Sequence, residues 1–305
     1  MRVLVTGGTG LLGWWIAGRL ASAGYDVVAT YHSNKPTPIS NVEWRRLDIT
    51  SPESVSTTIA DVKPDIVIHS AAYTDVDGCQ ENKRKAIATN YLGTTWVARS
   101  VAKRGARLIY ISTDYVFDGS RGNYKEDDEP NPVNYYGLTK LLGEAAIRAK
   151  ERSLVVRVSG LYGYSPTGKK NFAVKVVDTL VSGGTVKAFY DQFLSPTYAP
   201  ALAGLLVRAI EKSLEGVIHI AGSRLSRYEQ ALLIASILGA PRDRVVPVSL
   251  GDLALPAPRP KDSSLDTSKA GSLGIVHPSH EESTKEFVSY YLSVRESGVG
   301  GIGDS

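Results

Sequence analysis

The chain has 305 residues, 43% hydrophobic and 22% charged, so it can bury a large core in one domain or two closely joined ones. With 35 basic against 31 acidic residues, it lacks the charge excess of a nucleic-acid-binding protein. Its single cysteine excludes an intrachain disulfide, and neither a signal peptide nor an apolar run of about 18 residues is found. We therefore expect a cytoplasmic protein that binds neither nucleic acid nor membrane.

Strand and helix patterns alternate over the first 160 residues, which is typical of a parallel sheet covered on both faces. Strands are expected at residues 2–6, 26–31, 43–48, 65–70, 107–112 and 154–159. The helices between them are expected at about 12–23, after Ser51-Pro52, at 81–103 and from Tyr136. This order predicts an α/β fold with a Rossmann-type doubly wound parallel sheet.

The pattern becomes irregular after residue 160, with helices expected at 172–181, 200–214, 226–238 and 281–294 and a strand at 217–221. We interpret residues 1–160 as a dinucleotide-binding domain and 161–297 as mainly a smaller, partly interleaved substrate-binding region. Segments near 185–222 are expected to return to the sheet. The glycine-rich tail, residues 298–305, is expected to fray.

A glycine-rich turn follows the first strand and opens the first helix. It reads Gly7-Gly8-Thr9-Gly10-Leu11-Leu12-Gly13, so glycines recur at every third position. In a strand-turn-helix setting, such glycines permit close backbone approach, and the helix N-terminus attracts a pyrophosphate. Gly7, Thr9, Gly10, Leu11, Leu12 and Gly13 are therefore predicted to bind a dinucleotide.

The end of the second strand indicates which dinucleotide is bound. An acidic residue there would bind the ribose hydroxyls of NAD, whereas this chain has His32, Ser33 and Lys35, which could donate to a 2′-phosphate. NADP(H) is favoured, with NAD(H) as the alternative. Asp48-Ile49 and Ala71-Ala72-Tyr73 follow the third and fourth strands and should line the same crevice.

A tyrosine and a lysine four residues apart, Tyr136 and Lys140, begin a segment rich in helix formers. On a helix they share one face, and Thr113 ends the preceding strand, which indicates a proton-donating site. The spacing alone is weak evidence, because Tyr31 and Lys35 repeat it in a proline-containing loop. The helical context distinguishes the first pair.

These motifs together resemble the dTDP-4-dehydrorhamnose reductase family of the extended short-chain dehydrogenase/reductase superfamily. They are the glycine turn, Asn90, the run from Ser112 to Asp118, and Tyr136-Gly-Leu-Thr-Lys-Leu-Leu-Gly-Glu. The chain also resembles the NADP-binding regulatory β subunit of methionine adenosyltransferase. Both resemblances extend over nearly the whole chain.

The resemblance implies hydride transfer from a nicotinamide to a ketone, with Tyr136 donating the proton. Lys140 would lower the pKa of Tyr136 and hold the nicotinamide ribose, and Thr113 would hydrogen-bond the substrate carbonyl. Asn90 would brace the helix or a water chain behind Lys140, or serve simply as a helix polar group.

The resemblance also implies a sugar-nucleotide site. The residues it points to are Asp75, Thr113, Asp114, Tyr115, Val116, Gln192 and Arg259. Arg259 would suit a pyrophosphate, with a structural salt bridge as the alternative. The chain departs from the family where Val158–Gly163 lacks the tryptophan that packs on the sugar. It departs again at Trp15, which replaces an acidic residue used for magnesium, so no metal is expected.

The leading hypothesis is NADPH-dependent reduction of a nucleotide-linked 4-keto-6-deoxy sugar, dTDP-4-dehydro-L-rhamnose, to dTDP-L-rhamnose. The alternatives are a non-catalytic, NADP-binding regulatory subunit of the methionine adenosyltransferase type and a reductase or epimerase of another nucleotide sugar. A homodimer is expected for the enzyme, and a partner enzyme for the regulatory subunit.

Overall fold

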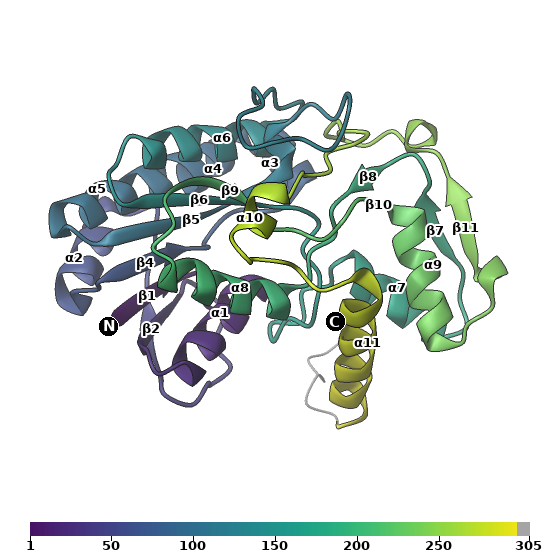
Figure 1. Ribbon diagram of the computed structural model, residues 1–305, viewed down its shortest axis with the longest axis horizontal. Coiled ribbons are helices and arrows are strands. Elements are labelled where there is room, and N and C mark those ends of the chain that lie inside the picture. The colour runs from purple at the N-terminus through teal and green to yellow at the C-terminus, as the bar shows by residue number, and fades with distance from the viewer. Residues whose placement is uncertain (298–305) are drawn as a thin grey trace.

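The computed structural model describes residues 1–297 and is built on one central parallel sheet (Figure 1). Its order, within those residues, is β3-β2-β1-β4-β5-β6-β9. The strands are β1 (Arg2–Thr6), β2 (Asp26–Tyr31), β3 (Val42–Arg46), β4 (Ile66–His69), β5 (Arg107–Thr113), β6 (Ser153–Val158) and β9 (Gly216–His219). Strands β2 and β3 lie on one side of β1, and β4, β5, β6 and β9 lie on the other. The strand order therefore reverses between β1 and β4, and a crevice is expected at the carboxyl ends of these two strands.

Helices cover both faces of the sheet, as predicted for a doubly wound fold (Figure 1). One face packs against α1 (Leu11–Ser22) and α8 (Ala199–Glu211), and the other against α2 (Pro52–Val62), α5 (Thr94–Arg104) and α6 (Tyr135–Arg148). Neighbouring side chains of β1 alternate between the two cores, because successive residues of a strand point to opposite faces. The predicted fold class is confirmed.

The single helix predicted at 81–103 is broken into several pieces. The pieces are α3 (Val76–Glu81), α4 (Lys83–Ala86), the π-helix η1 (Ile87–Gly93) and α5. Asn82 accepts a hydrogen bond from the Lys85 amide and so caps α4. Sequence periodicity did not reveal the wider π-helical turn, because the same apolar residues suit either winding.

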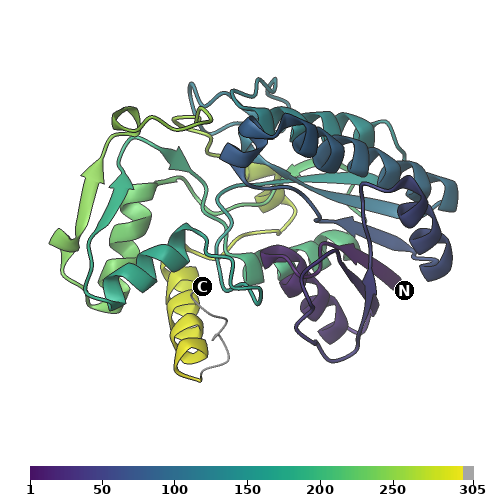
Figure 2. The ribbon, with the colours of Figure 1, turned by 180° about the vertical axis from the view of Figure 1, so that it is seen from behind.

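A smaller region lies beside the sheet (Figure 2). It contains α7 (Phe172–Val181), β7 (Val186–Phe189), β8 (Phe193–Leu194), β10 (Leu225–Ser226), α9 (Arg227–Leu238), β11 (Val245–Val248) and α11 (His280–Glu296). The short helix α10 (Ser268–Ser272) packs beside β9 of the central sheet instead. Short 3₁₀ turns are η2 (Asp114–Val116), η3 (Arg242–Arg244) and η4 (Leu250–Asp252). Strand β7 pairs with β11, and β8 pairs with β10.

The chain crosses between the two regions more than once. Of the segment 185–222 that we expected at the sheet, α8 and β9 pack on or join it, whereas β7 and β8 pair within the smaller region. The division at residue 160 stays a prediction. The tail, 298–305, lies outside the described residues. Within residues 1–297, no helix has both the length and the apolar character needed to cross a membrane.

Candidate active site

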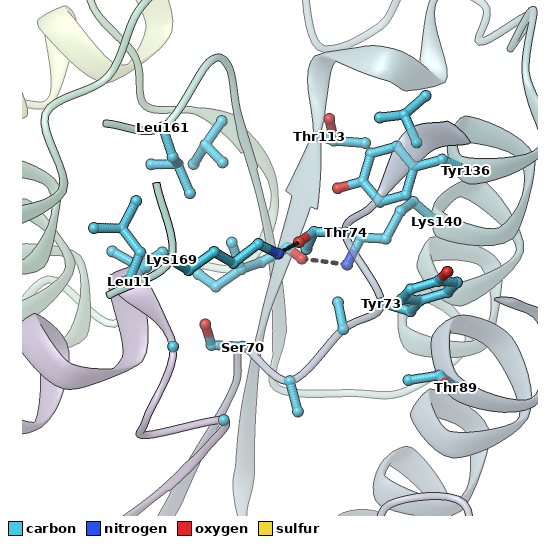
Figure 3. A pocket seen from close by; sticks show the side chains of 18 of the residues that line it. Leu11, Ser70, Tyr73, Thr74, Thr89, Thr113, Tyr136, Lys140, Leu161 and Lys169 are labelled. Carbon is cyan, nitrogen blue, oxygen red and sulfur yellow. Dashed lines mark hydrogen bonds between the residues drawn. The ribbon is translucent and has the colours of Figure 1, made fainter. Parts of the chain in front are cut away.

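A cavity of about 950 Å³ lies along the carboxyl ends of the sheet strands. Tyr73, Tyr136 and Lys140 line it on one side, and Leu11, Leu161 and Lys169 face them from the other (Figure 3). Most residues predicted from the sequence meet here. They are Gly7, Thr9, Gly10, Leu11, Leu12, His32, Ser33, Asp48, Ile49, Ala71, Ala72, Tyr73, Thr113, Asp114, Tyr115, Gln192, Tyr136 and Lys140.

The turn after β1 forms one end of the cavity. Gly7 has a φ of 69°, and a Cβ on it would lie 2.8 Å from the backbone of Ala71. Gly10 precedes α1, and no side chain caps that helix within the described residues, so its first amides remain available beside the cavity. This cradle fits the pyrophosphate of a dinucleotide, which binds free amides at a helix N-terminus.

Gly13 has a packing role rather than the predicted lining role. A Cβ added to it would stand 2.2 Å from the carbonyl oxygen of Gly7, so only glycine lets α1 approach the turn this closely. It therefore shapes the cradle without facing the cavity.

At the end of β2, His32 and Ser33 line the cavity, whereas Lys35 does not. The loop carries Lys35 past the cavity edge, where it is exposed. His32 Nε2 lies 3.7 Å from Asp48 Oδ2. A hydrogen bond from Thr50 lowers the pKa of Asp48, so this carboxyl stays ionised beside the imidazole.

The end of β5 meets the first turns of α6 at the centre of the cavity. Asn134 caps α6 by accepting from the Gly137 amide, and a Cβ on Gly137 would collide with the Tyr115 carbonyl oxygen. That close approach brings Tyr136 to the end of β5, where its phenol and Thr113 both line the cavity. A proton donor and a second hydroxyl therefore face the cavity together (Figure 3).

Lys140 lies one turn further along α6 and is only 3% exposed. Its Nζ donates to the Ile111 carbonyl oxygen at 2.7 Å and stands 4.1 Å from the centre of the Tyr110 ring. Loss of solvent lowers the pKa of Lys140 from 10.5 to about 7.

Loss of solvent also raises the pKa of Tyr136, although the sequence led us to expect Lys140 to lower it. The protein's own groups therefore keep the phenol protonated at neutral pH. That is the form a proton donor requires.

Asn90, predicted as catalytic, is 1% exposed and does not line the cavity. Its side chain accepts from the Tyr73 amide at 2.8 Å and donates to the Tyr73 carbonyl and to Thr139 Oγ1, each at 3.0 Å. It thus fastens the segment after β4 to α6. Asn90 is a positioning residue that braces the helix bearing Tyr136 and Lys140.

Three residues predicted for the substrate site lie elsewhere. Asp75 caps α3 by accepting from the Gly78 amide at 3.0 Å. Val116 is fully buried in a small apolar core. Arg259 forms a bidentate ion pair with Asp77, at 2.9 and 2.8 Å. This is the structural salt bridge that the sequence analysis gave as the alternative to a pyrophosphate contact.

Asp114, which faces the cavity beside Thr113, is 2% exposed. It accepts hydrogen bonds from the hydroxyls of Thr113, Ser159 and Ser263, which come from β5, the end of β6 and the smaller region. Loss of solvent raises its pKa. One carboxyl thus joins both regions at the edge of the site.

Sequence reasoning missed part of the cavity wall. The smaller region contributes Phe172, Leu194, Arg227 and Ser263. The Ser226-Arg227-Tyr228-Glu229 capping box that starts α9 is visible in the sequence, but it gives no sign that Arg227 faces the site. Within residues 1–297, no group of three or more His, Cys, Asp or Glu could hold a metal ion.

A doubly wound sheet, a glycine cradle at its switch point and a Tyr-Lys pair beside a strand-end threonine together define an extended short-chain dehydrogenase/reductase. Comparisons with known proteins agree. The family described as "RmlD substrate binding domain" matches residues 1–293.

The relatives are similar over most of their length. A probable low-salt glycan biosynthesis reductase of Haloferax volcanii is 36% identical over 288 residues, covering 92% of this chain and 95% of the relative. A dTDP-4-dehydrorhamnose reductase of Mycobacterium tuberculosis is also 36% identical, covering 92% and 89%. Methionine adenosyltransferase 2 subunit beta of Xenopus tropicalis is 31% identical, covering 90% and 83%.

Among solved structures, a dTDP-4-dehydrorhamnose reductase from Bacillus anthracis in complex with NADP matches with a TM-score of 0.84. It is 31% identical, and the match covers 95% of this chain and 99% of that one. This chain therefore belongs to the dTDP-4-dehydrorhamnose reductase family, as its motifs indicated.

Proposed function

We propose that this protein is an NADPH-dependent reductase that converts dTDP-4-dehydro-L-rhamnose to dTDP-L-rhamnose. The observation that carries the proposal is the Tyr136 phenol, kept protonated by loss of solvent, which lines the same cavity as Thr113 and the dinucleotide cradle. The named activity of the Mycobacterium relative and the NADP in the Bacillus structure support the substrate and the cofactor.

When bound, the reduced nicotinamide supplies the hydride that the ketone carbon accepts. The cradle of Gly7 and Gly10 would bind the pyrophosphate, and His32 and Ser33, which line the cavity at the end of β2, would hold the adenosine 2′-phosphate. The residues that follow β2 include no carboxylate to bind the ribose hydroxyls of NADH, which favours NADPH.

The chain's own residues handle the proton. Tyr136 donates its phenolic proton to the oxygen that becomes the alcohol, and Thr113 hydrogen-bonds the same oxygen. Lys140, held by the Ile111 carbonyl, is positioned by α6 to bind the nicotinamide ribose. As Tyr136 gives up its proton, the phenolate that forms favours the charged form of Lys140 nearby.

The direct test mixes purified protein, NADPH and dTDP-4-dehydro-L-rhamnose and follows the absorbance of the reduced nicotinamide. We expect oxidation of one NADPH for each molecule of dTDP-L-rhamnose, quantified by mass spectrometry. Tight binding of NADPH without any oxidation would contradict the proposal.

A second candidate is a non-catalytic regulatory subunit that binds NADP and contacts a partner enzyme. It is favoured by the beta-subunit relative and by Leu161, which lines the cavity in the stretch where the reductases place a tryptophan against the sugar. Under this alternative, the protein would change the kinetics of a methionine adenosyltransferase and leave the keto sugar unreduced. Oxidation of another nucleotide-linked keto sugar, and none with the rhamnose precursor, would instead reassign the substrate.

A further inference from the structure

The cavity wall formed by the smaller region contains a guanidinium that the proposed mechanism does not use. Arg227 is the first residue of α9, and its backbone amide donates to the Gln192 carbonyl at 3.1 Å. It lines the cavity together with Tyr115, Phe172 and Gln192. Asp114 and Tyr115 are close enough to affect its charge, which places it next to the Thr113 end of the site.

The neighbouring arginines of this region have carboxylate partners, and Arg227 does not. Arg259 is paired with Asp77, and Arg224 with Asp262 at 2.8 Å. Within residues 1–297, no carboxylate oxygen lies within 4 Å of the Arg227 guanidinium. Arg227 is only partly exposed, and partial loss of solvent around a cation without a paired carboxylate favours binding of an anion.

The surroundings of Arg227 leave part of its hydrogen-bonding edge free. The Phe172 ring covers one face, with its centre 4.7 Å from Cζ, and Nη1 donates to Gln230 Oε1 at 3.2 Å. Asp114, the acid close to Arg227, already accepts from three hydroxyls. Stacking fixes the guanidinium plane, and the remaining donors can bind two oxygens of one phosphoryl group.

We propose that Arg227, stacked on Phe172, binds the diphosphate of the nucleotide-linked substrate. The inference rests on the proposed function, because a keto sugar whose C4 carbonyl meets Tyr136 carries its diphosphate on C1, across the ring. The anion therefore lies on the side of the sugar away from the proton donor. Arg227 enters the cavity from α9 in the smaller region, whereas Tyr136 lines it from α6 on the side of the central sheet.

The test measures binding of dTDP and of thymidine, which lacks phosphate, to the NADPH-loaded protein by calorimetry. The Arg227→Gln substitution should weaken dTDP binding about 10- to 100-fold, which is the range expected for the loss of charge-assisted hydrogen bonds. It should leave thymidine binding unchanged. Arg224→Gln is the matched control, since it removes a paired arginine three residues away, and it should bind both ligands like the wild type.

Unchanged dTDP binding by Arg227→Gln, or equal losses for dTDP and thymidine, would overturn the assignment. NADPH affinity reports whether each variant is folded. If Arg227→Gln does not fold, Arg227→Lys replaces it in the test. Lysine keeps the positive charge but cannot donate two parallel hydrogen bonds as a guanidinium does, so dTDP should bind several-fold more weakly. Dependence of dTDP binding on Arg227 without turnover would refute the proposed reduction and leave this inference standing. Turnover of the keto sugar together with dTDP binding that does not depend on Arg227 would support the proposed reduction and refute this inference.

Discussion

The two sides of the cavity are built in different ways. On the side of the central sheet, the wall consists of turns and helix starts that glycines such as Gly7 and Gly137 allow to pack closely. On the other side, side chains such as Phe172, Gln192 and Arg227 reach in from separate segments. The shape of the first wall depends on the backbone, which holds the cofactor and the proton donor. The second wall consists of side chains that can be substituted without moving the backbone. Substitutions should therefore change turnover and NADPH binding on the first side, and affinity for the nucleotide sugar on the second.

The largest effect on the sheet side is expected from Tyr136→Phe. Removing the phenolic proton should lower kcat about 10²- to 10⁴-fold, because general-acid catalysis contributes that much. The Kd for NADPH, measured by its fluorescence, should stay the same. The matched control is Tyr135→Phe, which alters the adjacent tyrosine on α6. Equal kcat values for Tyr136→Phe and the wild type would show that Tyr136 is not the proton donor.

Lys140→Met should abolish turnover and yet stabilise the fold. Folding lowers the Lys140 pKa from 10.5 to about 7, so between those pH values the unfolded chain binds more protons than the folded one. The free energy of unfolding of the wild type therefore rises with pH across this window. The variant should be more stable by about 2–4 kcal/mol at pH 7, and the difference should shrink towards pH 10.

Urea unfolding of wild type and Lys140→Met, followed by circular dichroism at pH 7, 8.5 and 10, checks this. Lys175→Met provides the control, because Lys175 is exposed on α7 and should give a small, pH-independent change. A constant difference between wild type and Lys140→Met would mean that Lys140 is not desolvated as described.

Gly13→Ala should destabilise the cradle by about 1–3 kcal/mol, since its Cβ would stand 2.2 Å from the Gly7 carbonyl oxygen and α1 would have to move. NADPH binding should weaken along with thermal stability. Gly18→Ala in the same helix is the control, because its Cβ would meet nothing closer than Ile39 at 3.9 Å. That change should stabilise α1 by up to about 1 kcal/mol. Similar melting temperatures for the two variants would contradict the packing role of Gly13.

The smallest effect is expected where the two walls touch. Lys169 Nζ donates to Thr74 Oγ1 at 3.0 Å across the cavity (Figure 3). Because Lys169 is exposed, Lys169→Ala should weaken NADPH binding by no more than about fivefold. Lys170→Ala removes the adjacent lysine, which pairs with Asp178, and should change the affinity less. A loss beyond tenfold for Lys169→Ala would show that this contact closes the site.

The sequence predicted the parts of the site that depend on local spacing. The glycine turn, the strand-end Thr113 and the Tyr136–Lys140 pair follow from helix and strand periodicity, and the sheet edge brings them together. The second pair of the same spacing illustrates why context is needed: Tyr31 ends β2 and Lys35 lies in a loop.

The parts that the sequence could not predict depend on partners far along the chain. Arg259 is neutralised by Asp77, 182 positions away, and Asp114 receives a hydroxyl from Ser263, 149 positions away. Arg227 has no such partner among residues 1–297, and the absence of an ion pair leaves no pattern in a sequence. The pKa of Tyr136 depends on how much solvent the assembled walls exclude, which residue spacing does not record.

The π-helix η1 makes the geometry of this site depend on how many residues the segment contains, as well as on which residues they are. A π-helix holds one more residue per turn than an α-helix, so η1 amounts to a one-residue insertion within Ile87–Gly93. Deleting Ala88 would let the segment rewind as an α-helix and would change where the residues inside it, Asn90 among them, lie around the helix axis. Asn90 would then lose Tyr73 or Thr139, although every side chain named in the mechanism would still be encoded. Deletions in this helix would therefore harm the enzyme in a way that no substitution scan detects.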